Sequence, residues 1–212
     1  MPRYWHSLGF TPMPMHLKLP RLPLVIGFAA TAFVAFSSVR AGTALIISVP
    51  DQQLAVVRDG LKVATFPVST SKFGIGDRPS SFSTPVGELE VAQKIGAGAP
   101  AGAVFKHRMY TGEILRPNTP GRDPIVTRIL HLRGLEAKNS RAFDRGIYIH
   151  GTPEERKIGR PASYGCIRMK SRDVIQVFDT ATVGTRVEVV NTPLMRALKS
   201  TAAETRSPNP AS

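Results

Sequence analysis

The chain has 212 residues, enough for one domain of ordinary size with appendages, and 28 Lys and Arg against 15 Asp and Glu give it a formal charge of +13. A basic chain favours anionic surroundings, but the interleaved aromatic residues of a nucleic-acid platform are missing and a single cysteine excludes a zinc knuckle. The charge therefore favours a cell-wall or membrane-surface environment over nucleic acid.

Residues 1–41 are predicted to lie outside the folded domain. Basic residues precede an apolar run at 22–36, and small residues at 39–41 offer a cleavage point, which is the layout of an export signal. The run is shorter than the ~20 residues that cross a bilayer comfortably, but its extension to residue 39 leaves an uncleaved inner-membrane anchor open. In both cases the rest of the chain is expected in the periplasm or cell envelope. Three residues could begin the translated chain: Met1, Met13 and Met15.

Short strands are predicted directly after this segment. Residues 44–49 and 53–58 alternate apolar and polar side chains, and Asp59-Gly60 favours a tight hairpin turn into a return strand at 62–69. Residues 73–85 are rich in Gly, Ser and Pro without periodicity, which predicts a loop.

The middle of the chain combines two further strands with a long irregular region. Residues 88–94 alternate again, whereas 95–122 opens on a Gly- and Ala-rich run and predicts an insertion that could line or cover a groove. Residues 125–132 form an apolar strand candidate, in which a packed histidine is the favoured interpretation of His131 and a substrate contact the alternative. His107, in the irregular region, is given no role.

The last part of the chain predicts the remaining elements. Residues 147–150 alternate as a strand that ends at a histidine, and Ser171 is expected to cap a short helix with an apolar face. A final strand is predicted at 186–190. The tail from 191 to 212 holds one helical patch at 194–203 and a polar end that is expected to be disordered. The folded domain is therefore placed at 43–190, mainly β with one or two short helices.

The only cysteine is the first candidate for chemistry. The Cys166 thiolate is a strong nucleophile once a base or a positive field lowers its pKa. His150 closes a predicted strand, with Gly151 turning the chain, and can supply that base. Gly165 lets backbone approach a substrate closely, so the N–H groups of Tyr164, Gly165 and Cys166 are candidate oxyanion donors.

These residues resemble the active-site signature of the L,D-transpeptidase catalytic domain family, also called the YkuD domain. That signature is a His, followed some distance on by Ser/Thr-x-Gly-Cys-x-Arg/Asn; here His150 is followed by Ser163-Tyr-Gly-Cys-Ile-Arg168. The segment Ser83-Thr-Pro-Val-Gly-Glu-Leu89 resembles the family's Thr-Pro-x-Gly-x-aromatic motif, although Leu89 stands where an aromatic residue is usual. The resemblance covers roughly Thr43 to Val190 and implies a β-sandwich or barrel-like domain.

The resemblance also implies roles for individual residues. Cys166 matches the nucleophile, His150 the general base and later acid, and the Gly151 carbonyl the group that orients the imidazole. The positions expected to bind substrate are Ser163, Arg168 and Tyr148. For Ser163 a hydroxyl that only orders the loop is equally open, as is a structural ion pair with the catalytic loop for Arg168.

The activity implied by the resemblance is acyl transfer on peptidoglycan stem peptides. Cys166 would attack the carbonyl of the third stem residue, release the terminal D-alanine and form a thioester. An amine on a second stem or a wall-linked protein, or water, would then resolve that thioester, so an L,D-carboxypeptidase remains open. No metal or organic cofactor is implied. Two hypotheses from different classes compete with this one: a metal site built from His131, His150 and Cys166, and a catalytically silent wall-binding protein.

Overall fold

The computed structural model describes residues 42–206 of the chain. The predicted export signal or anchor at 1–41 and the polar end of the tail at 207–212 lie outside the described residues. The described part contains ten strands: β1 Thr43–Ser48, β2 Gln53–Arg58, β3 Leu61–Pro67, β4 Gly87–Ile95, β5 Ala103–Lys106, β6 Met109–Ile114, β7 Ile125–Gly134, β8 Tyr148–Gly151, β9 Ile167–Met169 and β10 Arg186–Val190. It also contains two α-helices and two 3-10 turns: α1 Ser171–Thr180, α2 Leu194–Arg206, η1 Ala137–Asn139 and η2 Glu155–Lys157.

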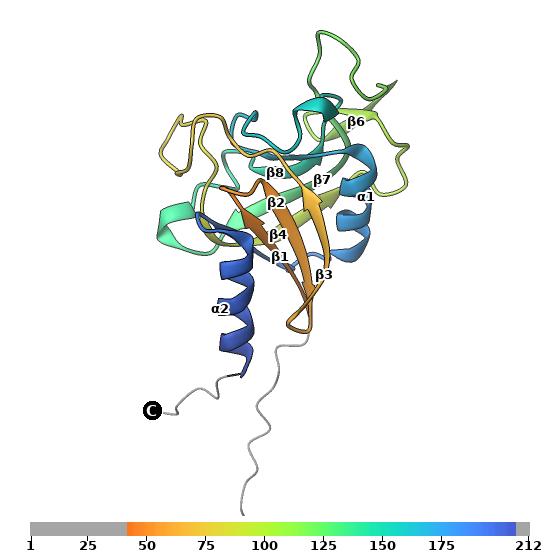
Figure 1. Ribbon diagram of the computed structural model, residues 1–212. Helices are drawn as coiled ribbons and strands as arrows, with labels where there is room; N and C mark the ends of the chain where they lie inside the picture. The colour runs from red at the N-terminus through yellow and green to blue at the C-terminus, as the bar shows by residue number, and fades with distance from the viewer. Residues whose placement is uncertain (1–41, 207–212) are drawn as a thin grey trace, which may run out of the picture. The chain divides into compact units, whose positions relative to one another are not determined.

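All ten strands belong to one sheet, in which the main order is β3-β2-β1-β10-β4-β7-β5-β6. β8 pairs with β7 on one side and with β9 on the other. β1 and β10 run parallel, so the first and last strands of the domain are neighbours, and β10 also pairs with β4. The sheet is thereby joined through strands from both ends of the sequence (Figure 1).

A short backbone contact joins β9 to the segment that follows β3. The N–H of Ser69 donates to the carbonyl of Arg168 and the N–H of Arg168 donates to the carbonyl of Ser69, both at 2.9 Å. Because β3 and β9 stand at different ends of the pairing order, this contact closes the sheet on itself. The prediction of a mainly β domain with barrel-like character is confirmed.

The helices cover the sheet at two places. α1 packs against β7 and β8, and the main hydrophobic core lies beneath it; α2 packs against β1 over a smaller cluster (Figure 1). The main core includes Leu45, Val91, Leu130, Leu132, Ile149, Ile167, Val174, Val177 and Phe178. Within residues 42–206 neither helix has the length and apolar character that a transmembrane span requires.

Most strand predictions match the structure, and two of the local predictions are wrong. The Asp59-Gly60 turn has positive φ at both residues, 50° and 78°, as a type I′ hairpin requires. The segment 95–122, predicted to be irregular, contains the β5–β6 hairpin. Ser171 does not cap α1, because Lys170 is the N-cap residue and makes no side-chain capping bond. The predicted helical patch at 194–203 lies inside α2.

Candidate active site

The candidate catalytic residues lie along the parallel pair β8–β9. Ile149 pairs with Ile167 and His150 with Arg168. Successive side chains of a strand point to opposite faces, so the two isoleucines enter the main core while His150 and Arg168 share the other face. Cys166 directly precedes β9, in the turn that leads into this strand.

His150 is buried and its ring is oriented by the backbone. Its Nδ1 lies 2.8 Å from the carbonyl oxygen of Gly151, so a proton on Nδ1 leaves the lone pair on Nε2. Burial lowers the pKa of His150 to about 4, the charge of Arg168 adds to the shift, and the hydrogen bond to Gly151 opposes it. The imidazole is consequently neutral near pH 7 and able to accept a proton.

The neighbouring strand β7 leaves no room for a side chain at Gly151. A Cβ atom there would lie 2.6 Å from the carbonyl oxygen of Val126 and 3.1 Å from the Cβ of Thr127. This crowding arises at a bulge of β7, where the pairing with β8 shifts and Thr127 has a φ of 73°. The bulge and the glycine together bring the Gly151 carbonyl to the imidazole.

The Cys166 thiol also rests against a backbone carbonyl. Its Sγ donates to the oxygen of Gly146 at 3.3 Å. Burial raises the pKa of Cys166, whereas the N–H of Tyr148 and the charges of Arg168 and Arg145 oppose that shift. The resting thiol is therefore protonated, and it needs a base at the moment of attack.

The turn before the thiol is ordered by its own hydrogen bonds. The fully buried hydroxyl of Ser163 donates to the Cys166 carbonyl at 2.6 Å and accepts from the N–H of Gly165 at 3.2 Å. This geometry favours a loop-ordering role for Ser163. It also engages the Gly165 N–H within the turn, so Tyr164 and Cys166 are the stronger predicted oxyanion donors.

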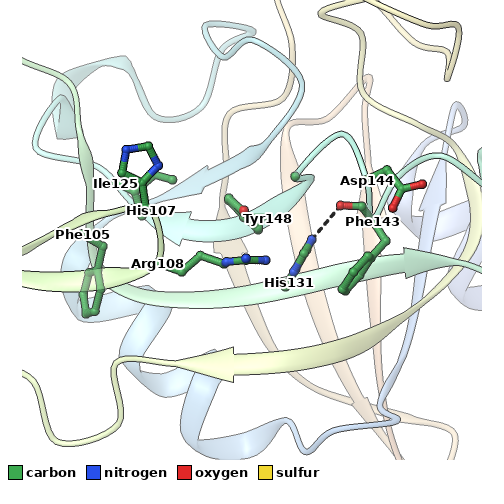
Figure 2. A pocket seen from close by; sticks show the side chains of 9 residues that line it. Phe105, His107, Arg108, Ile125, His131, Phe143, Asp144 and Tyr148 are labelled. Carbon is green, nitrogen blue, oxygen red and sulfur yellow. Dashed lines mark hydrogen bonds between the residues drawn. The ribbon is translucent and has the colours of Figure 1, made fainter.

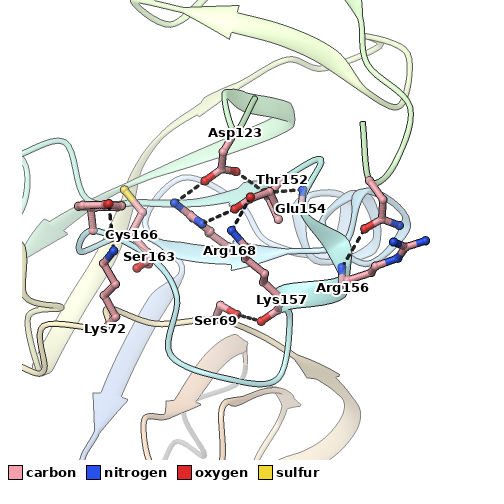
Figure 3. Close-up of polar contacts among 12 residues, drawn as sticks. Ser69, Lys72, Asp123, Thr152, Glu154, Arg156, Lys157, Ser163, Cys166 and Arg168 are labelled. Carbon is pink, nitrogen blue, oxygen red and sulfur yellow. Dashed lines mark hydrogen bonds and ion pairs between the residues drawn. The ribbon is translucent and has the colours of Figure 1, made fainter. Parts of the chain in front are cut away.

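Arg168 sits in a buried ion-pair network (Figure 3). Its guanidinium lies 2.6 Å from a carboxylate oxygen of Asp123 and 3.5 Å from one of Glu154, and Thr152 donates to Asp123 at 2.6 Å. Arg168 is only 8% exposed. The geometry favours the structural ion pair that the sequence left open, with the cation acting on the thiol through its field.

A sequence model of the L,D-transpeptidase catalytic domain, YkuD, matches residues 42–189. The chain belongs to the L,D-transpeptidase family. YqjB of Bacillus subtilis (strain 168), whose name assigns it to the L,D-transpeptidases, is 30% identical over 148 residues, which make up 69% of this chain and 70% of that protein. A Fuscovulum blasticum protein with L,D-transpeptidase in its name is 48% identical over 76 residues, 35% of each chain.

Solved structures of L,D-transpeptidases also align with the chain. One from Mycobacterium smegmatis covers 71% of this chain at 18% identity, with a TM-score of 0.44. The alignment includes 59% of the Mycobacterium smegmatis chain, so the present chain matches about three fifths of that structure.

This L,D-transpeptidase family member has a cavity of about 550 Å³, seen in Figure 2. Gly146, which accepts from the thiol, and Tyr148 both line it, together with Phe105, His107, Arg108, Ile125, His131, Phe143 and Asp144. His131 is buried, stacks on Phe143 at 4.0 Å between ring centroids and has its Nε2 2.9 Å from the Phe143 carbonyl oxygen. These contacts agree with the interpretation of His131 as a packed histidine. The same residue also lines the cavity.

Sequence reasoning missed Arg145, which fastens the loop before the Thr84-Pro85 motif. Its guanidinium pairs with Asp77 at 2.5 Å and donates to the carbonyls of Ser81 and Ser83, both at 2.7 Å. The side chain of Arg145 is 12% exposed and that of Asp77 is 5% exposed. Only a contact map could have linked these residues, because they lie more than sixty positions apart.

A metal site built from His131, His150 and Cys166 requires three ligands at one place. Among residues 42–206 there is no group of three or more His, Cys, Asp or Glu side chains that could hold a metal ion. Nε2 of His131 points to the backbone carbonyl of Phe143, and Nδ1 of His150 points to that of Gly151. The two histidines and the thiol therefore do not form a ligand set.

Proposed function

We propose that the chain is an exported L,D-transpeptidase that performs cysteine-dependent acyl transfer on peptidoglycan stem peptides in the periplasm or cell envelope. The observation that supports this proposal is a neutral, backbone-oriented His150 on β8, paired with Arg168 of β9, the strand that Cys166 directly precedes. Because His150 pairs with Arg168, two residues after Cys166, the imidazole and the thiol belong to neighbouring segments of the sheet and of its preceding turn. Family membership supports the substrate class.

The first half of the reaction forms a thioester. Nε2 of His150 takes the thiol proton while Sγ of Cys166 attacks the carbonyl carbon of the third stem residue. The N–H groups of Tyr164 and Cys166 stabilise the resulting oxyanion. Collapse breaks the peptide bond to the terminal D-alanine, whose amine leaves with the proton held by the imidazolium.

The second half returns the enzyme to its resting state. An amine of a second stem or a wall-linked protein attacks the thioester carbonyl, and His150 accepts the proton that this amine loses. A new amide bond forms, the carbon–sulfur bond breaks, and the thiolate takes the proton back. Water in place of the amine gives the L,D-carboxypeptidase reaction through the same thioester.

Arg168 contributes to both halves through its charge. A cation beside the site stabilises a developing thiolate and disfavours a permanent imidazolium, which matches its effects on the pKa values of Cys166 and His150. The carboxylates of Asp123 and Glu154 fix its position and moderate its field.

The experiment is intact mass spectrometry of the protein mixed with a disaccharide-tetrapeptide, with the small products analysed in the same run. We expect a thioester adduct and loss of terminal D-alanine, and the ratio of cross-linked dimer to free tripeptide will separate transpeptidase from carboxypeptidase. Cys166→Ala removes the only thiol of the chain and is the matched control. Absence of both adduct and product from folded wild-type protein would contradict the proposal and favour a silent wall-binding protein.

A further inference from the structure

The Thr84-Pro85 pair of the upstream motif lies against the turn that carries the thiol. The buried hydroxyl of Thr84 donates to the carbonyl oxygen of Gly165 at 3.0 Å. The same hydroxyl oxygen accepts from the N–H of Ser71 at 3.0 Å. Because a hydroxyl carries one hydrogen and the Ser71 amide supplies its own, the hydrogen of the Thr84 hydroxyl is committed to Gly165.

Thr84 is held in place on both sides of its backbone. Its N–H donates to the carbonyl of Gly74 at 3.0 Å, and its own carbonyl accepts from the N–H of Gly76 at 2.8 Å. Pro85 restricts the residue before it to extended backbone, and the β-branched side chain of threonine has few χ1 rotamers. The direction of the hydroxyl is therefore set before any substrate binds.

Gly165 lets this segment come close to the turn. A Cβ atom at Gly165 would lie 3.3 Å from the carbonyl oxygen of Ser83 and 3.5 Å from that of Phe82, and the φ of Gly165 is 117°. A side chain there would displace the segment that carries Thr84 and would strain the backbone. The glycine of one motif and the threonine of the other thus form a single contact, although they lie 81 positions apart.

The hydrogen bond from Thr84 fixes a peptide plane whose other end is a predicted oxyanion donor. The carbonyl of Gly165 and the N–H of Cys166 belong to the same planar trans peptide, in which these two groups point in opposite directions. Since the carbonyl is directed at Thr84, the N–H of Cys166 is directed away from it. Ser163 fixes the next peptide by donating to the Cys166 carbonyl at 2.6 Å. Hydroxyl groups thereby orient both peptides that adjoin Cys166.

We propose that Thr84 is a positioning residue for acyl transfer, whose hydroxyl holds the Gly165–Cys166 peptide so that the Cys166 N–H is aimed at the oxyanion formed on attack. This inference rests on the proposed function, in which that N–H is an oxyanion donor. A donor lowers the barrier most when it is already directed at the developing charge, because turning a peptide during the reaction costs part of the stabilisation. Thr84 acts through the peptide, and its role requires no contact with the substrate.

The test separates attack on a carbonyl from another reaction of the same thiol. With p-nitrophenyl acetate, Sγ of Cys166 bonds to the acetyl carbon, an oxyanion forms, p-nitrophenolate leaves and the thiol proton passes to His150. Iodoacetamide instead alkylates the sulfur by displacing iodide from a saturated carbon, so no oxyanion forms. The acylation rate depends on the aim of the Cys166 N–H, whereas the alkylation rate depends on the thiolate and its accessibility.

Thr84→Val keeps the size and the β-branch of the side chain and removes its hydroxyl. We expect acylation to slow roughly 10- to 100-fold, as for a misdirected oxyanion donor, and alkylation to stay within about twofold of wild type. Thr84→Ser restores the hydroxyl and should return acylation to within about threefold of wild type, because serine has a freer χ1. If Thr84→Val does not fold, Thr84→Ala gives the same comparison, because a water in the vacated space can satisfy both backbone groups without directing them.

Thr70→Val is the matched control. Thr70 is as fully buried as Thr84 and lies in the same segment after β3, but its hydroxyl oxygen accepts from the side-chain amide of Gln52 at 2.7 Å. The control should lose stability as Thr84→Val does, yet keep both rates within about twofold of wild type. Equal slowing of acylation and alkylation in Thr84→Val, unchanged acylation in that variant, or a matching loss of acylation in the control would overturn the positioning role.

The ester also keeps this inference distinct from the proposed function, because it contains no stem peptide. Selective loss of ester acylation in Thr84→Val would support the positioning role even if wild-type protein releases no D-alanine from the tetrapeptide. Release of D-alanine by Thr84→Val at the wild-type rate would support the proposed function and overturn the positioning role. Wild-type protein that reacts with iodoacetamide and not with the ester would also overturn it, since no oxyanion is then stabilised.

Discussion

Acid should destabilise the folded protein through His150, whose pKa lies at about 4 in the fold against 6.5 for an unperturbed imidazole. Between these values the unfolded chain binds a proton that the folded chain does not bind, so the free energy of unfolding falls as the pH is lowered through this window. Below about pH 4 both states are protonated and the loss is complete. The gap corresponds to about 3 kcal/mol, of which about 2 kcal/mol is lost between pH 7 and pH 4.5.

The measurement is urea unfolding of wild-type protein and of His150→Gln at about pH 7 and about pH 4.5. Burial also lowers the pKa of His131, so both proteins will lose stability in acid and only the difference between them reports on His150. We expect the variant to lose about 2 kcal/mol less than wild type. Equal losses would show that the imidazole of His150 is not held neutral by burial, and would remove the basis for its role as a ready base.

Three further substitutions test the geometry around the thiol. Gly165→Ala places a side chain at a φ of 117° and should lower the free energy of unfolding by about 1–3 kcal/mol, measured by thermal denaturation; an unchanged midpoint would contradict the strain. Arg145→Ala removes the cation that pairs with the buried Asp77, which then keeps only the N–H of Arg141, and should lower the free energy of unfolding by about 3 kcal/mol, with faster proteolysis of the loop at 73–85; an uncut loop would refute the clamp. Asp123→Asn removes one carboxylate from Arg168 and should shift the alkylation profile of the thiol to lower pH; an identical profile would refute the field effect.

The strands that the sequence predicted well are those with strong alternation or an obvious turn. Residues 53–58 and 186–190 match β2 and β10 in both bounds, and Asp59-Gly60 forms the expected hairpin turn. The β5–β6 hairpin escaped because its turn is made by His107 and Arg108 rather than by Gly, Asn or Asp. Tertiary packing stabilises that turn, and the local sequence does not predict it.

The residues of the candidate site also fall into those that the sequence could predict and those that it could not. The short stretch around Cys166 and the His150-Gly151 pair could be found from sequence, because strand, turn and nucleophile are close together along the chain. The carboxylate that holds Arg168 and the Arg108 side chain that lines the cavity come from the segment 95–124, whose place beside β8 follows only from the pairing of β5 and β7. A single sequence contains no local signal for such pairings.

The position of β10 makes the last strand of the domain essential to its first. β10 lies between β1 and β4, so a chain that ends before residue 186 would join β1 to β3 to the strands beside the histidine and the thiol only through short contacts such as the one between Ser69 and Arg168. Contacts between distant parts of a chain form slowly, because closing the large loop between them costs chain entropy before the contacts can stabilise the fold. Synthesis from the amino terminus therefore delivers the cysteine before its enclosing sheet can be complete, and the thiol is shielded from solvent only once the whole domain has emerged.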